Sequence, residues 1–212
     1  MRQLLIAVAL ASACASGCKS SAEEQAVAAM RESLAAAQER DLDGAKAAAE
    51  RASALRPGFV DPLMMLARIA EERGDCDEAR RLYTEVLVLD PTSSGAGVAI
   101  ALTFVREQRF DEARNWLDKS IESDPGCEPA AYNHGSLAEQ QADLERAVAW
   151  FDVASALDPR DPRAPCRIAS IRLLQQRPQD ALAAAESALR RSPRSAAALA
   201  LRARALQALG RD

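Results

Sequence analysis

Several residue types that mark enzymes, β-sheets and metal sites are scarce or missing in this sequence. Aromatic residues make up only 4% of the 212 positions, and His134 is the only histidine. No Cys-x-x-Cys pair, glycine-rich phosphate loop, nucleophile elbow or catalytic pair of carboxylates is present. Few aromatics combined with abundant alanine suit closely packed helices better than a β-sheet. These absences predict an all-α, non-enzymatic protein with no catalytic residue, no cofactor and no metal site.

The charged residues also limit the choice of partner. Lys and Arg are interspersed with Asp and Glu, and the net charge is −4 with a pI near 5.3. Such a pattern offers no basic stripe that could neutralise a run of phosphates, so we predict no nucleic-acid partner. The content of 49% apolar and 27% charged residues is that of a folded chain with a substantial core.

The amino terminus has the layout of an export signal. A positive start at Arg2 is followed by an apolar run and then by the small residues that precede Cys18. The apolar stretch of about 15 residues is shorter than the roughly 20 that a spanning helix needs. The ending Ala15-Ser16-Gly17-Cys18 resembles the lipobox of bacterial lipoproteins, in which the cysteine is acylated and becomes the first mature residue. We therefore expect a signal peptide over residues 1–17, lipid attachment at Cys18 and a membrane anchor through that lipid.

Two alternatives to Cys18 remain at this stage. Ala15 stands where a lipobox usually has Leu, and Cys14 follows a similar run of small residues. An ordinary signal cut after Ala13 or Ala15 would instead release a soluble protein. By the lipoprotein resemblance, Lys19 after the cysteine implies retention in the outer membrane, facing the periplasm.

A period of 34 residues runs through the rest of the chain, and a repeat should be sought before any single element is assigned. An alanine recurs at this spacing five times, and a proline follows each alanine by twelve residues. The alanines are Ala45, Ala79, Ala113, Ala147 and Ala181, and the prolines are Pro57, Pro91, Pro125, Pro159 and Pro193. A regular period with no register slip predicts five copies of one structural unit.

Each unit has the pattern of two helices. Acidic residues precede the marker alanine, where the amino end of a helix favours them, and apolar residues return four and seven places later. The proline ends that second helix because it lacks an N–H and restrains the residue before it. A small residue twelve places before the alanine predicts a close helix crossing. These small residues are Ser33, Ala67, Ala101, Gly135 and Ala169, with Ala203 at the same phase.

At these positions the chain resembles the tetratricopeptide repeat. The clearest copies contain Leu63, Leu66, Ala67, Gly74, Ala79, Tyr83 and Pro91, and Tyr132, Asn133, His134, Gly135, Ala147, Phe151 and Pro159. The resemblance implies an all-α, right-handed superhelical solenoid of antiparallel helix pairs. We place a linker at 18–25, repeats at 26–59, 60–93, 94–127, 128–161 and 162–195, and a capping helix at 196–212.

Some copies depart from the family pattern. Ala49 and Ala185 replace the usual aromatic, so the first and fifth repeats should be softer than the middle. Gly95 and Gly97 should delay the first helix of the third repeat to about Val98. Pro162 and Pro165 should likewise delay the first helix of the fifth repeat. Gly74 and Gly210 are expected to cap first helices at their carboxyl ends.

The resemblance also implies where a partner would bind, because the concave wall of such solenoids is lined by the first helices. Flexible apolar side chains, a tyrosine and two arginines on that wall would suit a peptide with apolar anchors and an acidic group. Each of these residues could instead be ordinary packing between repeats. The candidates are Met30, Leu34, Met64, Arg68, Leu102, Val105, Arg106, Tyr132, Asn133 and Ser136.

The remaining polar candidates favour structural roles. His134 has no partner at a catalytic spacing, so we expect a histidine in a helix interface with one hydrogen bond. Cys76, Cys127 and Cys166 are expected as unpaired thiols, with a Cys127–Cys166 disulfide as the alternative in an oxidising compartment.

Three functional hypotheses follow from the sequence. The first is a non-enzymatic envelope lipoprotein that binds or assembles a protein or peptide partner in its groove, similar to a pilot protein. The second is a soluble periplasmic or secreted regulator without a lipid. The third is an accessory to an enzyme complex that itself catalyses nothing.

Overall fold

The computed structural model describes residues 21–210, so the predicted signal peptide, Cys14 and Cys18 lie outside the described residues. Residues 21–38 form a leading helix, which includes part of the stretch expected to be a linker. Ten helices follow it. They are α2 (Leu42–Leu55), α3 (Val60–Glu72), α4 (Cys76–Leu89), α5 (Ser94–Arg106), α6 (Phe110–Ser123), α7 (Glu128–Gln140), α8 (Leu144–Leu157), α9 (Arg163–Leu174), α10 (Pro178–Arg191) and α11 (Ala196–Ala208).

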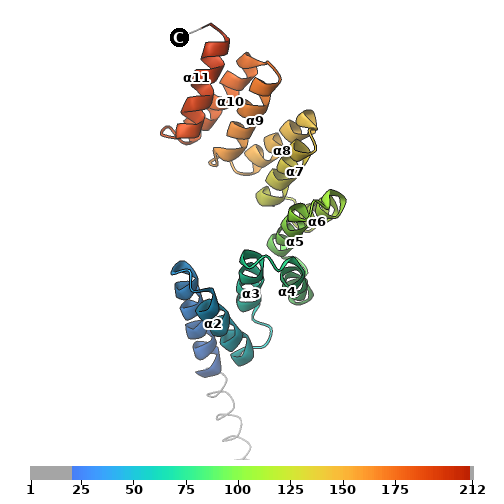
Figure 1. Ribbon diagram of the computed structural model, residues 1–212, viewed down its shortest axis with the longest axis vertical. Helices are drawn as coiled ribbons and strands as arrows, with labels where there is room; N and C mark the ends of the chain where they lie inside the picture. Colours follow the sequence, from blue (N-terminus) through green and yellow to red (C-terminus); the bar gives the residue numbers. More distant parts are fainter. Residues whose placement is uncertain (1–20, 211–212) are drawn as a thin grey trace, which may run out of the picture. The chain divides into compact units, whose positions relative to one another are not determined.

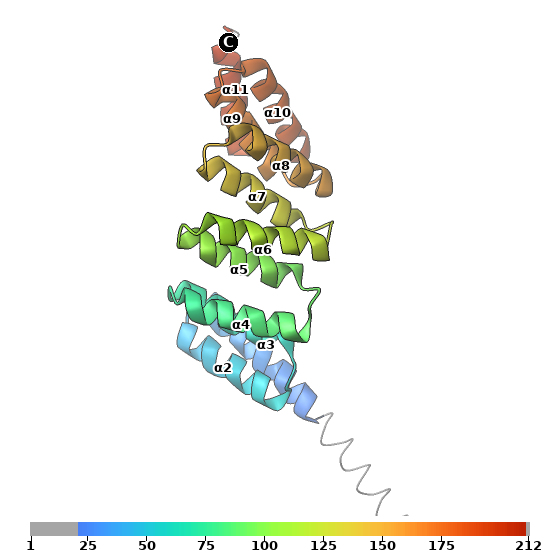
Figure 2. The same ribbon diagram turned by 90° about the vertical axis from the view of Figure 1, so that its right-hand side faces the viewer.

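The helices form successive antiparallel pairs in two compact units (Figure 1). The first unit ends at Pro91 and contains the leading helix, α2, α3 and α4. The second begins at Thr92 and contains α5 to α11, with α9, α10 and α11 packed together at its end (Figure 2). This all-α arrangement confirms the predicted fold class. Within residues 21–210, no helix is long and apolar enough to cross a bilayer.

The predicted helix crossings lie at the expected residues. All five marker alanines are fully buried, and the small residues of the five first helices are buried opposite them. In the first repeat the Ser33 hydroxyl donates a hydrogen bond to the Ala45 carbonyl at 2.7 Å. Ala203 has the same phase in α11 but is exposed, because no further helix within the described chain packs on that side. Small side chains therefore permit the two helices of a repeat to approach closely, and they are buried only where a second helix packs on them.

Acidic caps begin three of the second helices. The carboxylates of Asp41, Asp75 and Asp143 accept hydrogen bonds from backbone N–H groups three residues later. These caps recur with the 34-residue period, and each satisfies one N–H that the first turn leaves unpaired. Arg109 and Arg177 occupy the same position in the other two repeats and give no side-chain cap.

The second helices end two residues before the periodic prolines, as predicted; α8, for example, ends at Leu157 before Pro159. The first helices end in a left-handed backbone conformation, also once per repeat. Gly74 and Gly210 hold this conformation as expected, with φ of 80° and 66°. Four other residues also adopt it, and for them it is strained. They are Arg40, Gln108, Ala142 and Gln176.

One predicted helix boundary is wrong and one is confirmed. Helix α5 begins at Ser94, so Gly95 and Gly97 do not delay it to Val98. The reason is tertiary: a Cβ on Gly97 would lie 2.4 Å from Ser120 Oγ, so glycine is what permits α6 to pack there. Helix α9 begins at Arg163 after Pro162, one residue later than the repeat would place it, as expected. Pro165 causes no further delay, because it lies in the first turn of α9, where proline is tolerated.

Candidate functional site

Within the second unit, the first helices of successive repeats are neighbours. Helix α5 contacts α7, and α9 contacts α11. Side chains of α9 also pair with side chains of α7: Arg167 with Glu139, and Arg163 with Glu128. The first helices of this unit therefore form one connected surface, which we call the first-helix face.

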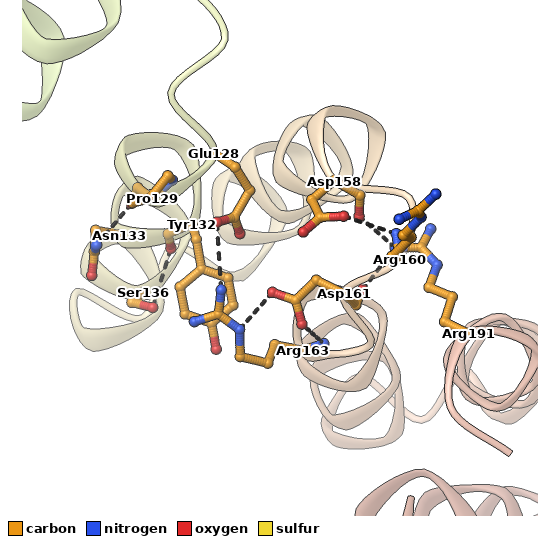
Figure 3. Close-up of polar contacts among 10 residues, drawn as sticks. All are labelled: Glu128, Pro129, Tyr132, Asn133, Ser136, Asp158, Arg160, Asp161, Arg163 and Arg191. Carbon is orange, nitrogen blue, oxygen red and sulfur yellow. Dashed lines mark hydrogen bonds and ion pairs between the residues drawn. The ribbon is translucent and has the colours of Figure 1, made fainter. Parts of the chain in front are cut away.

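Tyr132 is the most firmly held predicted residue on this face. Its ring meets the buried Phe151 ring edge-on, with centroids 5.2 Å apart and planes inclined by 61°. The Arg163 guanidinium lies over the same ring, 4.8 Å from its centroid (Figure 3). Edge-on packing and a cation over the ring are both favourable for an aromatic side chain. Tyr132 is only partly buried, so part of this fixed aromatic side chain remains exposed.

Arg163 is held in turn by two carboxylates (Figure 3). Its Nε donates to Asp161 Oδ2 at 2.5 Å, and its Nη2 lies 3.4 Å from Glu128 Oε2. Burial raises the pKa of the Glu128 carboxyl above its ordinary value, while the Arg163 charge lowers it in part. Burial also raises the pKa of the Tyr132 hydroxyl, with Arg167 and Arg163 opposing. At neutral pH, Tyr132 is therefore a neutral phenol that can donate or accept a hydrogen bond.

The other predicted residues of this face differ in what they can offer a partner. Asn133 donates to the Pro129 carbonyl at 2.7 Å and Ser136 to the Tyr132 carbonyl at 3.2 Å, so both have bonds within α7. On α5, Leu102 is 37% exposed, whereas Val105 is half-buried against the core. Arg106, at the end of the same helix, is exposed. The exposed leucine and arginine of α5, the helix that contacts α7, have the apolar and basic character predicted for a peptide site.

Two of the four predicted residues of the first unit line a pocket there. Leu34 and Arg68 line a pocket of about 280 Å³ between the leading helix and α3, together with Met65, Gln38 and Glu72. Met64 is half-buried and does not line this pocket. Met30 is 9% exposed and belongs to the core around Ala45 and Ala49. Its side chain therefore takes the packing alternative rather than facing a partner.

The sequence did not predict several residues of the first-helix face. Arg163 and Arg167 add positive charge to this face, and Glu128 and Glu139 add negative charge. The period could have identified two of them, because Arg167 follows Asn133 by 34 residues and Glu139 follows Val105 by 34. The contact of Arg163 with the Tyr132 ring had no signal in the sequence, since it depends on how α9 packs beside α7.

The other candidates, one histidine and three cysteines, lie in environments typical of structural rather than catalytic residues. His134 is buried and stacks on Trp150, with ring centroids 4.3 Å apart and planes within 10°. Its Nε2 lies 3.1 Å from Asp118 Oδ1, close enough for an ion pair but not aligned for a hydrogen bond. Cys76, Cys127 and Cys166 are free thiols, so the alternative Cys127–Cys166 disulfide is not formed. Among residues 21–210, no group of three His, Cys, Asp or Glu side chains is placed to hold a metal.

Comparisons with known proteins agree with this architecture. Two family models described as tetratricopeptide repeat match the chain, one over residues 36–96 and the other over 98–162 and 166–212. Cellulose synthase 2 operon protein C of Komagataeibacter xylinus is 30% identical over 159 residues, which cover 74% of this chain and 12% of that protein. Human tetratricopeptide repeat protein 7A is 29% identical over 119 residues, covering 56% and 14%. The chain thus spans a small part of these curated relatives.

Two solved structures have a similar fold over most of this chain. PilF of Pseudomonas aeruginosa has a TM-score of 0.75 at 17% identity, covering 90% of this chain and 86% of that one. PilW, described as a type IV pilus biogenesis factor, has a TM-score of 0.70 at 22% identity, covering 87% and 86%. At these identities the likeness establishes the fold alone.

Proposed function

Because the chain belongs to the tetratricopeptide repeat family, we propose that it is a non-enzymatic scaffold that binds a partner protein on its first-helix face. We further propose that it is an envelope lipoprotein, anchored through Cys18 in the outer membrane, that helps to assemble its partner. If these proposals fail, two alternatives are left: a soluble regulator without a lipid, and an accessory to an enzyme complex.

The binding proposal depends chiefly on Tyr132. An aromatic ring fixed by Phe151 and Arg163 loses little freedom when a partner covers it, so the entropy cost of binding there is small. Tyrosine and arginine are also the residues that most often dominate binding energy in protein interfaces. The exposed Leu102 adds apolar area on the neighbouring first helix.

The assembly role is supported by the fold and the amino terminus together. PilF and PilW share the fold over most of their length, and PilW is described as a pilus biogenesis factor. The lipobox-like ending before Cys18 would place this chain in the cell envelope. The proposed partner is therefore an envelope protein.

Photo-crosslinking tests the binding proposal. A photoreactive phenylalanine at Tyr132 should capture a discrete envelope protein in living cells. The matched control places the same residue at Ala149, which is exposed on the second helix α8. Equal capture at both positions, or none at Tyr132, would remove the first-helix face as the binding site.

Metabolic labelling with a fatty acid tests the lipid anchor. We expect the label to be lost in Cys18→Ser and kept in Cys14→Ser. Label that survives Cys18→Ser would refute the attachment site, and an unlabelled wild-type chain in the soluble fraction would favour the regulator.

A further inference from the structure

The positive charge of this chain is concentrated at one end, contrary to the dispersal expected above. Residues 160–212 contain 11 arginines, no lysine and 4 acidic residues, for a net charge of +7. Residues 21–159 contain 14 basic and 27 acidic residues, for a net charge of −13. The overall value of −4 hides this difference, because it sums both segments and the two basic residues of positions 1–20.

Half of the described arginines in this segment have no partner among the described residues. Arg163, Arg167, Arg172 and Arg177 each pair with a carboxylate. The structure shows no side-chain partner within residues 21–210 for five others: Arg160, Arg190, Arg194, Arg202 and Arg204. The basic excess is therefore available at the surface rather than consumed by internal ion pairs.

Two of these free guanidinium groups border one pocket. Pro159, Arg160, Ser187, Arg190 and Arg191 line an open depression of about 550 Å³ between the loop after α8 and the end of α10. A pocket in the first unit, of about 380 Å³, is also lined by charged side chains. There, however, Arg81 pairs with Glu78 and Lys46 with Glu50, so its charges are satisfied internally. The pocket at Arg160 and Arg190 contains no acidic side chain in its lining.

Arg191 makes this pocket a fixed structure. Its Nη1 donates to the Asp161 carbonyl at 2.9 Å and to the Asp158 carbonyl at 3.3 Å (Figure 3). Its Nη2 donates to Ser155 Oγ at 2.7 Å. The Arg160 N–H donates to Asp158 Oδ1 at 2.9 Å. These bonds hold the loop that carries Arg160 against the end of α10, which carries Arg190. Arg191 is therefore a positioning residue, and Arg160 and Arg190 are the groups left to bind a ligand.

We infer that this arginine pocket binds an acidic segment of the partner protein, an inference that rests on the proposed scaffold function. A guanidinium group binds a carboxylate through two parallel hydrogen bonds, which a lysine cannot do. The partner segment would place one carboxylate between Arg160 and Arg190. Neighbouring acidic residues would be attracted by the remaining free arginines.

A short acidic peptide fits these charges better than an extended polyanion. Residues 92–159 of the same unit contain 5 basic and 12 acidic residues, for a net charge of −7. A membrane surface or a nucleic acid would extend beyond the pocket and be repelled by this net negative charge. A peptide confined to the pocket avoids that repulsion.

The test measures binding of a fluorescent oligo-glutamate peptide to the full-length chain by anisotropy, with oligo-glutamine as the neutral probe. We expect oligo-glutamate alone to bind, and less tightly as salt is added. Arg160→Glu with Arg190→Glu should weaken binding roughly tenfold, because two favourable ion pairs become repulsive. Arg160→Gln with Arg190→Gln should fall between this variant and the wild type. The control, Arg31→Glu with Arg40→Glu, makes the same charge change at exposed positions of the first unit and should change binding less than about twofold.

Equal weakening in the pocket and control variants would overturn the inference, because net charge alone would then explain binding. It would also fail if phosphatidylglycerol vesicles bound through Arg160 and Arg190 while oligo-glutamate did not. Its failure can be separated from that of the proposed function. Loss of crosslinking at Tyr132 with oligo-glutamate binding retained removes only the first-helix face, and the reverse result removes only the arginine pocket.

Discussion

In the fourth and first repeats, equivalent helices cross at the same positions but pack through different side chains. In the fourth repeat, Gly135 faces the ring of Phe151, which is fully buried. In the first repeat, Ser33 donates a hydrogen bond to Ala45, and the fully buried Ala49 stands where the aromatic would be. The same 34-residue phase is thus satisfied by one large ring or by small side chains and a hydrogen bond.

This difference separates geometry from stability. The position of the crossing depends on phase, which both repeats share, whereas the buried apolar area is much larger under an aromatic ring than under alanine. Tyr83 and Phe151 are among the largest fully buried side chains of the described residues. We therefore expect the fourth repeat to be firmer than the first, and substitutions at the two crossings should have unequal effects.

Phe151→Ala should have the largest effect, lowering the free energy of unfolding by about 3–5 kcal/mol, because it empties a fully buried site. Urea denaturation followed by circular dichroism measures this change. Val88→Ala, at a side chain that is 75% exposed, is the matched control and should change stability little. A loss below about 1 kcal/mol for Phe151→Ala would mean that the crossing can collapse around the missing ring.

Gly135→Ala should have the next largest effect on stability. An added Cβ would lie 2.7 Å from the Phe151 ring, an overlap that costs about 1–3 kcal/mol and is offset in part by the helix preference of alanine. Gly95→Ala is the control, since its Cβ would meet nothing within 4 Å. That variant should raise the melting temperature, whereas Gly135→Ala should lower it. A change of melting temperature in the same direction for both variants would contradict the close approach of Gly135 to the Phe151 ring.

Ser33→Ala tests the first repeat and should cost about 0.5–1.5 kcal/mol, the usual net value of one buried hydrogen bond. Hydrogen exchange of the leading helix and α2 would locate the loss. Ser123→Ala, at an exposed serine, should leave exchange unchanged. If Ser33→Ala were as costly as Phe151→Ala, the proposed difference between the two repeats would be wrong.

The smallest expected effect depends on pH and belongs to the fourth repeat. Burial lowers the pKa of His134 below its ordinary 6.5, with Arg146 and Arg114 acting in the same direction and Asp118 opposing. The unfolded chain then binds a proton more readily, so stability is complete above about pH 6.5 and falls as the pH drops through the lowered pKa. Thermal melts of the wild type and His134→Gln between about pH 7 and pH 5 measure this contribution. An equal slope in both would show that other groups cause it.

Most of the helix pattern could be predicted from the sequence, because it depends on neighbours within one or two turns. The marker alanines, the terminating prolines and the glycine caps at Gly74 and Gly210 were all correctly assigned. The left-handed residue at Ala142 was missed, since local preference argues against it and the turn between α7 and α8 imposes it. The start of α5 was misplaced for the same kind of reason, because Gly97 serves packing against Ser120.

The candidate site was less predictable than the fold. Phase placed Tyr132, Asn133 and Ser136 on one helix, but it could not distinguish a buried Met30 from an exposed Leu34 at neighbouring turns. Nor could it show that Arg163 covers the Tyr132 ring. These features depend on the packing of adjacent helices, which the helical period alone does not specify.

The sequence by itself determined the repeat, the sites of the helix crossings and the uneven distribution of charge, because each depends only on the order and spacing of residues. Only the tertiary structure decided which side chains of the first helices are exposed and which arginines lack partners. The physical reason is that exposure and ion pairing depend on distances between helices. Arg191 and Arg190 are adjacent in sequence, yet one bonds the loop after α8 and the other borders the arginine pocket.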